Sequence, residues 1–265
     1  MTAPLALVTG GVKRVGAAIA ARLAEAGYML ALHGNSDAVP ETQLAEKLKE
    51  TGCEWSGFQQ DFLVEGAAEI LIDQVVGHFG RVPDLIVNSA SIFGQDDACS
   101  LEERDLQEHF RINSLVPILL TTALHHRRPA GSDRACVIHI LDQRIRNPNR
   151  DQLSYTLSKQ ALAGSVRSLA VACADKLRVN GVAPGLTLTA GEYGEDQLAN
   201  ITGMMPLGRL PEPGDIADAT IYLARAKAVT GQIIFVDGGA NLKGFDRDFV
   251  HLAKGDRPDT PEGTG

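Results

Sequence analysis

The chain has 265 residues, of which 44% are hydrophobic and 22% are charged, so it can bury a sizeable core. Its formal net charge of −8 argues against nucleic acid or an anionic membrane surface as the main partner. No apolar stretch approaches the ~18 residues that span a bilayer, and the N-terminus lacks the basic lead-in of a signal peptide.

Along the chain, short apolar runs alternate with longer segments of helical period. The apolar runs, which we expect to form strands, cover residues 4–10, 28–34, 54–61, 84–90, 136–141, 176–182 and 232–239. The periodic segments, which we expect to form helices, cover residues 17–27, 40–52, 64–79, 102–126, 152–174 and 214–226. In the second helix, Pro40 is expected in the first turn and Gly52 just past the end.

Strands rich in valine, isoleucine and leucine that alternate with helices indicate a mostly parallel sheet covered on both faces. The alternation runs unbroken to about residue 242, which predicts a single α/β domain over 1–245 with a doubly wound, seven-stranded sheet. Residues 246–265 turn polar and rich in proline and glycine, so we expect a mobile tail there. Part of this tail, FVHL at 249–252, could anchor on a neighbouring subunit.

Residues 187–209, between the last two strands, are expected to form a mobile lid over a substrate. Met204, Met205 and Leu207 could line that lid, but methionines in such a loop are as often filler for the core. The sequence leaves both alternatives open.

The four cysteines, Cys53, Cys99, Cys136 and Cys173, lie far apart and show no C-x-x-C spacing. We therefore expect reduced, mostly buried thiols of a cytoplasmic protein, with zinc or disulfide use as the less favoured alternative. The pair His125–His126 stands at a helix end, where adjacent positions do not share a face, so no metal site is expected.

The first strand is followed by TGGVKRVG (9–16), which leads into a helix. In parallel sheets of this kind, ligands bind outside the carboxyl ends of the strands. Small residues in the turn let backbone N–H groups and the helix dipole meet a pyrophosphate, which favours a dinucleotide site. Arg14 lies inside the turn and can donate to a cofactor phosphate or an anionic substrate edge; the alternative is a solvated surface arginine.

The second strand ends in LHGNSD (32–37), and no acid directly ends it. His33, Asn35 and Ser36 can donate to a 2′-phosphate, which favours NADP over NAD, although Asp37 is close by and an ordinary polar turn is the alternative. After the third strand, Asp61 could accept from an adenine amine or cap the next helix.

The fourth strand runs into NSASIFG (88–94). Its small residues Asn88, Ala90 and Ser91 would let the backbone pass close to a cofactor. Phe93 offers a flat apolar surface for an aromatic substrate, or else packs into the core.

Tyr155 and Lys159 stand four residues apart, hence on one helix face. A free tyrosine has a pKa of about 10, and a nearby ammonium lowers it and makes the phenol a usable general acid. Such a donor typically contributes on the order of 10² to 10⁴ in rate. The alternative is an exposed polar helix face.

Seven motifs occur in a fixed order along the chain: TGGVKRVG, Asp61, NSAS, Asn113 in FRINSLVP, the pair Tyr155/Lys159, VNGVAPG (179–185) and VDGG (236–239). Through them, residues 4 to about 242 resemble the short-chain dehydrogenase/reductase superfamily. The resemblance implies a Rossmann-like fold, a nicotinamide cofactor, a common tetrameric state and Tyr155 as proton donor. It also implies that Lys159 holds the nicotinamide ribose and lowers the tyrosine pKa, while Asn113 supports a proton-relay water.

Two residues depart from the superfamily pattern. Arg14 replaces the middle glycine of TGxxxGxG, and Asp142 stands where a serine is usual, thirteen residues before the tyrosine. Both departures occur in the pteridine reductases and bacterial dihydromonapterin/dihydrofolate reductases, which the chain also resembles in Phe93 and in PGLT (184–187). In that subgroup the phenylalanine sandwiches a pterin against the nicotinamide, and the arginine reaches both cofactor phosphate and pterin.

Asp142 is the residue that bears most directly on the substrate. A carboxylate can accept from both the amino group and the ring N–H of a pterin, which a serine could not do. It could also share or relay a proton with Tyr155. The alternative is that Asp142 caps a turn or pairs with Arg144 or Arg146.

Together these features predict an NADPH-dependent reductase of a pterin-like C=N bond, with catalytic residues Asp142, Tyr155, Lys159 and Asn113. A ketone-reducing member of the same superfamily is the first alternative, and a non-catalytic NADP(H) sensor the second. The residues expected to bind the cofactor are Gly10, Arg14, Val15, Gly16, His33, Asn35, Ser36, Asp61, Phe62, Asn88, Ser89, Ala90, Ser91, Tyr155, Lys159, Pro184, Gly185, Leu186 and Thr187. Those expected to bind the substrate are Arg14, Ser91, Phe93, Asp142, Tyr155, Gly185 and Leu186.

Overall fold

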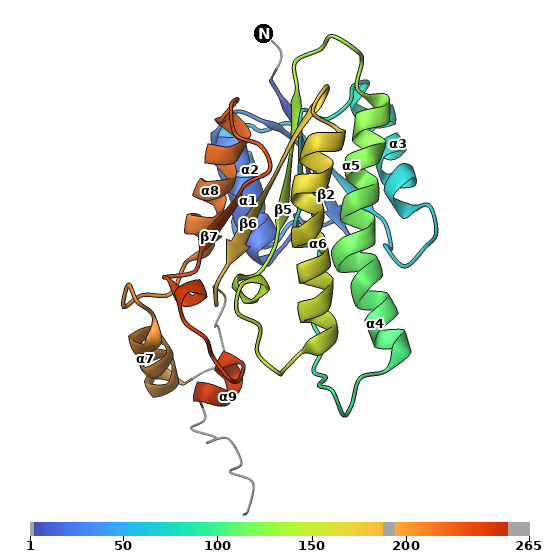
Figure 1. Ribbon diagram of the computed structural model, residues 1–265. Coiled ribbons are helices and arrows are strands. Elements are labelled where there is room, and N and C mark those ends of the chain that lie inside the picture. The colour runs from blue at the N-terminus through green and yellow to red at the C-terminus, as the bar shows by residue number, and fades with distance from the viewer. Residues whose placement is uncertain (1–2, 188–193, 254–265) are drawn as a thin grey trace, which may run out of the picture.

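A parallel sheet of seven strands runs through the centre of the protein (Figure 1), in the order β3-β2-β1-β4-β5-β6-β7. The structure, a computed structural model, describes residues 3–187 and 194–253. The strands are β1 (Leu5–Thr9), β2 (Met29–Gly34), β3 (Trp55–Gln59), β4 (Leu85–Asn88), β5 (Ala135–Ile140), β6 (Leu177–Pro184) and β7 (Ile233–Val236). Every pairing between them is parallel, and the order reverses between β1 and β4. The predicted doubly wound α/β fold is therefore confirmed.

Helices cover both faces of this sheet. The helices of the described residues are α1 (Arg14–Glu25), α2 (Thr42–Thr51), α3 (Ala67–Phe79), α4 (Glu103–Phe110), α5 (Val116–Arg127), α6 (Leu153–Ala172), α7 (Glu195–Met204), α8 (Pro213–Arg225) and α9 (Phe249–Ala253). Of these, α7 and α9 pack on each other beyond the end of the sheet. In Figure 1, α1, α2 and α8 lie against one face, and α3, α5 and α6 lie against the other. The strands are buried on both sides, which explains why they read as continuous apolar runs.

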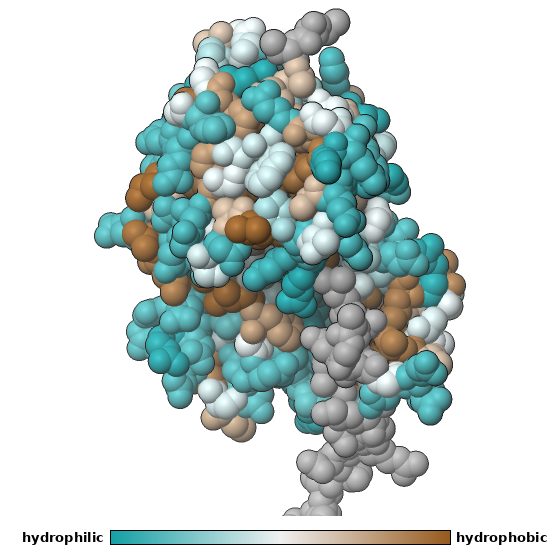
Figure 2. Space-filling view, turned by 180° about the vertical axis from the view of Figure 1, so that it is seen from behind, coloured by the Kyte–Doolittle hydropathy of each residue, from teal (hydrophilic) through white to brown (hydrophobic). Residues whose placement is uncertain are grey.

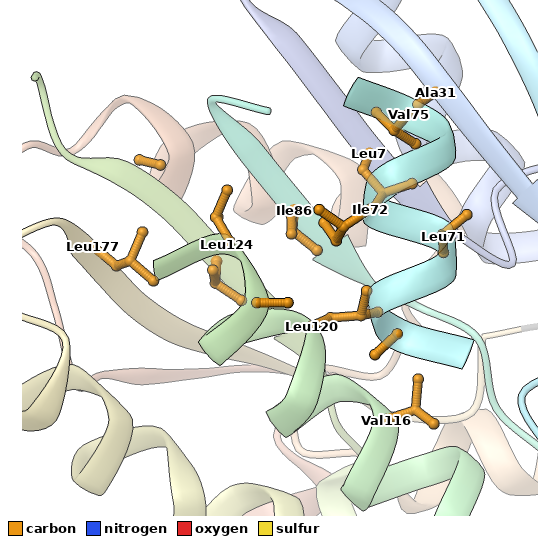
Figure 3. Close-up of a cluster of buried hydrophobic side chains, with 14 of the residues drawn as sticks. Leu7, Ala31, Leu71, Ile72, Val75, Ile86, Val116, Leu120, Leu124 and Leu177 are labelled. Carbon is orange, nitrogen blue, oxygen red and sulfur yellow. The ribbon is translucent and has the colours of Figure 1, made fainter. Parts of the chain in front are cut away.

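Successive side chains of a strand enter different cores. In β1, Leu5 and Leu7 pack with α3 and α5, while Ala6 and Val8 pack with α1 and α8. Figure 3 shows the first of these cores, where Leu7 and its neighbours on the sheet meet side chains of α3 and α5. This packing fixes the sheet and leaves the carboxyl ends of the strands at one edge of the molecule.

The helices differ from the predicted ones in several places. The helices α7 and α9 were not predicted, and α7 lies within 187–209, the segment expected to be a mobile lid. The long helix expected over 102–126 is interrupted by a π-helical turn at Arg111–Leu115, which joins α4 to α5. Pro40 precedes α2 instead of lying in its first turn, because the helix begins at Thr42 after an extended Glu41. Gly52 ends α2 with a φ of +63°, as its position predicts.

The described part of the expected tail packs back on its own chain. Phe249, on α9, is buried against Ile201, Met205 and Ala240 of its own chain. Its side chain is therefore not available to anchor on a neighbouring subunit. Met205 is thus core filler, while Leu207 is exposed. Residues 188–193 of the expected lid and 254–265 of the expected tail lie outside the described residues.

The surface seen from behind in Figure 2 is largely hydrophilic, with hydrophobic side chains in small separate patches. Within the described ranges, no helix has the length and apolar character needed to cross a membrane. The four cysteines are free thiols: Cys136 and Cys173 are buried, Cys53 is half-buried and Cys99 is exposed.

Candidate active site

The carboxyl ends of β1, β2, β4, β5 and β6 surround a cavity of about 650 Å³. This volume lies within the range of small-molecule sites, and the place is where doubly wound sheets bind their ligands. Eighteen of the expected residues line it: Gly10, Arg14, Val15, Gly16, His33, Asn35, Ser36, Ser89, Ala90, Ser91, Phe93, Asp142, Tyr155, Lys159, Pro184, Gly185, Leu186 and Thr187. In the described part of the chain, Asp61, Phe62, Asn88 and Asn113 do not line it.

The turn between β1 and α1 packs too tightly for larger residues. A Cβ atom on Gly10, whose φ is +60°, would lie 2.9 Å from the Cα of Ala90, and one on Gly16 would lie 2.0 Å from the Gly10 carbonyl oxygen. Lys13, the residue before α1, makes no side-chain capping hydrogen bond, and the first turn of the helix carries no acid. The N–H groups of this turn that follow Arg14, together with the helix dipole, therefore fit a dinucleotide phosphate.

Arg14 begins α1 and lines the cavity as an exposed side chain. Its φ of +58° is unusual for a residue that is not glycine, and its backbone N–H donates to Glu41 Oε2 at 3.2 Å. The strained position keeps a cation beside the glycine-rich turn and at the edge of the cavity.

His33 supports this turn instead of offering a donor to a ligand. Its Nδ1 accepts from the Gly10 N–H at 3.2 Å, so Nε2 carries the proton and donates to the Gln60 carbonyl at 2.8 Å. The ring is stacked on Phe62 at 4.2 Å, and burial lowers its pKa to about 4. The expectation that His33 donates to a 2′-phosphate is wrong, because both ring nitrogens are already engaged. Phe62 is likewise a buried packing partner.

The depressed pKa of His33 predicts acid destabilisation. The unfolded histidine titrates near 6.5 and the folded one near 4, so stability from the neutral ring is complete above pH 6.5 and is lost as pH falls towards 4. We expect His33 to contribute a drop of about 3 kcal/mol in the free energy of unfolding over this window, as measured by urea denaturation. Buried His139, whose pKa is lowered to about 3, adds a drop of its own. In His33→Gln the drop should shrink, whereas the exposed His126→Gln should retain it. An unchanged drop in His33→Gln would contradict this assignment.

Two more residues that were expected to bind the cofactor form hydrogen bonds within the protein instead. The Asn88 side chain, 2% exposed, donates from Nδ2 to His139 Nδ1 at 3.1 Å. Asp61 Oδ1 accepts from the Leu63 N–H at 2.8 Å and so caps a turn before α3, which itself begins later, after Gly66. Of the two roles expected for Asp61, the structure therefore favours capping, but of a turn and not of the helix.

Asn113 projects from the π-helical turn, a feature that often occurs at functional sites. Its Oδ1 accepts from Ser91 Oγ at 3.1 Å and from the Ile92 N–H at 2.9 Å, while Nδ2 donates to the Ile92 carbonyl and to Ser158 Oγ. These four hydrogen bonds use the full capacity of the side-chain amide, which therefore holds the loop after β4. Support of a proton-relay water by Asn113 stays a prediction.

Asp142 follows β5 and lies beside Tyr155 of α6. The Tyr155 hydroxyl donates to Asp142 Oδ2 at 2.9 Å. The other carboxylate oxygen, Oδ1, accepts from the Arg144 N–H at 2.8 Å and lies 3.3 Å from Arg144 Nε. Asp142 therefore caps the short turn after β5 and pairs with Arg144, which is the structural role that the sequence offered as the alternative. It also contacts Tyr155, the proposed proton donor.

The acidity of Tyr155 differs from the expected one. Burial first, and the negative charge of Asp142 next, raise the pKa of Tyr155 well above 10, against the opposing charge of Arg144. Lys159 does not reverse this: its Nζ donates to the Ile140 carbonyl at 2.9 Å, and burial lowers its own pKa to about 8. The expected lowering of the tyrosine pKa is thus not found. Tyr155 is held in its protonated, proton-donating form.

The side chain of Phe93 is exposed instead of packing into the core. It is 54% exposed, lines the cavity and meets the Tyr155 ring edge-on at 4.8 Å. The guanidinium of Arg144 lies 5.8 Å from the Phe93 ring centre and 5.3 Å from that of Tyr155. A flat apolar surface thus faces the cavity beside the tyrosine hydroxyl.

Sequence reasoning missed several residues of the site. Arg144 entered it only as a possible partner of Asp142, yet it lines the cavity together with Gln143. Asp248 and Phe249 also line it, although they belong to the segment expected to be a tail. Nothing in the local sequence signals Asp248, which stands 104 residues from its partner Arg144.

Comparison with known proteins places this chain among oxidoreductases. A sequence model described as enoyl-(acyl carrier protein) reductase matches residues 11–241. The crystal structure of FolM alternative dihydrofolate reductase 1 from Brucella canis, complexed with NADP, has a TM-score of 0.79 and 32% identity, covering 91% of this chain and 95% of that one. A putative ketoacyl reductase 2 of granaticin polyketide synthase from Streptomyces violaceoruber is 30% identical over 91% of this chain and 97% of that protein. Pteridine reductase 1 of Leishmania tarentolae is 28% identical over 91% of this chain and 97% of that protein.

Proposed function

Because this chain belongs to the short-chain dehydrogenase/reductase family and is an oxidoreductase, we propose that it uses NADPH to reduce a pterin-like C=N bond. The observation that carries this proposal is Asp142, a carboxylate in the cavity hydrogen-bonded to Tyr155. A neutral hydroxyl at this position would suit a ketone, whereas a carboxylate suits a substrate with N–H groups. We further propose that the protein works in the cytoplasm, which its unpaired cysteines support, and as a homotetramer, which rests on the family resemblance alone.

The cofactor part of the proposal rests on the turn after β1 and the end of β2. The N-terminus of α1 would hold the pyrophosphate, and Arg14, Asn35 and Ser36 line the cavity where a 2′-phosphate needs donors. Lys159 would donate to the nicotinamide ribose. When bound, the reduced nicotinamide supplies a hydride to the carbon of the C=N bond. The NADP complex of the Brucella canis protein supports the same choice of cofactor here.

The substrate part rests on Phe93, Asp142 and Tyr155. The exposed face of Phe93 would stack on a flat heterocycle, which supports an aromatic substrate. Asp142 would accept hydrogen bonds from ring N–H and amino groups, and so would orient the heterocycle. Tyr155 would give its proton to the nitrogen of the C=N bond, so that one hydride and one proton complete the reduction. The pteridine reductase of Leishmania tarentolae supports this substrate class.

A small ketone is the second candidate substrate. The contact between Arg144 Nε and Asp142 Oδ1, at 3.3 Å, favours it, because a carboxylate neutralised by its own arginine contributes less to binding. The putative ketoacyl reductase from Streptomyces violaceoruber supports the same alternative.

An assay with purified protein separates the two. We expect oxidation of NADPH, followed by its absorbance, with at least one of dihydrobiopterin, dihydromonapterin and dihydrofolate, and slower turnover with NADH. Small ketones serve as the comparison substrates. Turnover of ketones with no turnover of any pteridine would overturn the substrate proposal and leave the enzyme class intact.

A further inference from the structure

Arg144 lies buried between two carboxylates from distant parts of the chain. Its Nη2 donates to Asp248 Oδ2 at 2.7 Å, and its Nε lies 3.3 Å from Asp142 Oδ1. Arg144 and Asp248 are each 5% exposed. A buried guanidinium that faces two carboxylates interacts strongly with both. Its position therefore sets how strongly it stabilises the negative charge of each one.

The segment before α9 holds Asp248 in place. The Asp248 N–H donates to Asp151 Oδ2 at 2.7 Å, and Arg247 Nε contacts the same carboxylate at 3.1 Å. On the other side, Phe249 is buried against α7. Asp248 is therefore a fixed part of the cavity wall. The Arg144 guanidinium is held by this carboxylate through Nη2 and by the Gln152 side-chain oxygen through Nη1.

The guanidinium of Arg144 interacts less strongly with Asp142 than with Asp248. The Arg144–Asp248 contact is a hydrogen bond, whereas Arg144 Nε makes no hydrogen bond to any partner in the described ranges. A guanidinium that turned fully onto Asp142 would form a two-pronged pair and occupy the carboxylate. In the observed position, Asp142 keeps the Tyr155 hydroxyl on Oδ2 and the Arg144 backbone N–H on Oδ1.

We propose that Asp248 is a positioning residue: by holding Arg144, it keeps the guanidinium from closing on Asp142 and leaves that carboxylate able to accept from a substrate N–H. This inference rests on the proposed function, because only a nitrogen heterocycle needs Asp142 as acceptor. Arg144 and Asp248 would then set the preference for such substrates without contacting the transferred hydride or proton.

The same three charges act on Tyr155. The charged groups that face its hydroxyl are Asp142, Arg144, Asp248 and, from its own helix, Lys159. After burial and Asp142, the charge of Asp248 also raises the pKa of Tyr155, while Arg144 lowers it. Removing the Asp248 charge, and letting Arg144 neutralise Asp142, should both lower the tyrosine pKa.

Steady-state kinetics of Asp248→Asn test the inference. We expect KM for a dihydropteridine to rise roughly tenfold, the scale of one hydrogen bond to a charged group, with kcat less affected. KM for a ketone should not rise, since a ketone presents no N–H to Asp142. The basic limb of the kcat/KM profile should move to lower pH on either substrate. Asp248→Glu, which keeps the charge, should restore most of both properties.

The exposed Asp246→Asn, two residues away, is the matched control and should behave as the parent protein does. An unmoved pH profile and an unchanged KM in a folded Asp248→Asn would overturn the inference. If neither Asp248→Asn nor Asp248→Ser folds while Asp248→Glu does, the role of Asp248 is stability alone and the inference is also overturned. Failure of the proposed function looks different: the parent protein would reduce no pteridine, and the pH profile on a ketone would still decide the role of Asp248.

Discussion

Tyr155→Phe is expected to lower kcat by on the order of 10² to 10⁴, because it removes the group that gives the proton to the substrate nitrogen. The Tyr155 ring is 8% exposed and packs against Phe93, so phenylalanine should fill the same space without unfolding the protein. Binding of NADPH, measured by quenching of protein fluorescence, should change by only a few-fold. A loss confined to turnover separates proton donation from cofactor binding.

Tyr222→Phe is the matched control, since Tyr222 is 56% exposed on α8 and lies away from the cavity. It should leave turnover unchanged. If Tyr155→Phe retained parental kcat on every substrate, the proton would have to come from another group, and the role given to Tyr155 would be wrong.

Asp142→Asn is expected to lower kcat/KM for a dihydropteridine by roughly 10²-fold, because it replaces a charged acceptor with a neutral amide that must also place two donors. The change also removes a charge that raises the pKa of Tyr155, so the basic limb of the pH profile should move to lower pH. Turnover of small ketones should be affected far less. The ratio of the two kcat/KM values is therefore the quantity to measure.

The second variant at this position, Asp142→Ser, separates the two candidate substrates. If ketones are the substrates, serine should be tolerated or even improve turnover, because it restores a neutral hydroxyl beside Tyr155. If pteridines are the substrates, Asp142→Ser should lose activity on them as Asp142→Asn does. The exposed Asp133→Asn is the control and should change neither. Equal losses on both substrates would contradict a role of Asp142 in substrate choice.

The fold and much of the site could be predicted because they depend on local pattern. Buried parallel strands read as apolar runs, and the residues that follow each run must meet at one edge of the sheet. That reasoning placed the turn at Gly10, the pair Tyr155/Lys159 and Asp142 around one cavity.

The parts that failed depend on contacts between distant segments. Whether His33 is free to bind a ligand depends on the backbone of Gly10 and Gln60, which close on both of its ring nitrogens. Whether a tyrosine beside a lysine becomes more acidic depends on burial and on the nearest carboxylate, and here both act in the opposite direction. The place of Asp248 beside Arg144 follows from packing of α9 on α7, which no periodicity in that polar segment indicates.

The π-helical turn at Arg111–Leu115 has a consequence for protein engineering. Asn113 reaches Ser91 and Ile92 because this turn is wider than the α-helical turns on either side of it. Deleting one residue within 111–115 would favour a regular helix and rotate Asn113 away from the loop it holds, even though the asparagine itself is kept. In redesigned or grafted versions of this protein, the length of this segment therefore matters as much as its composition.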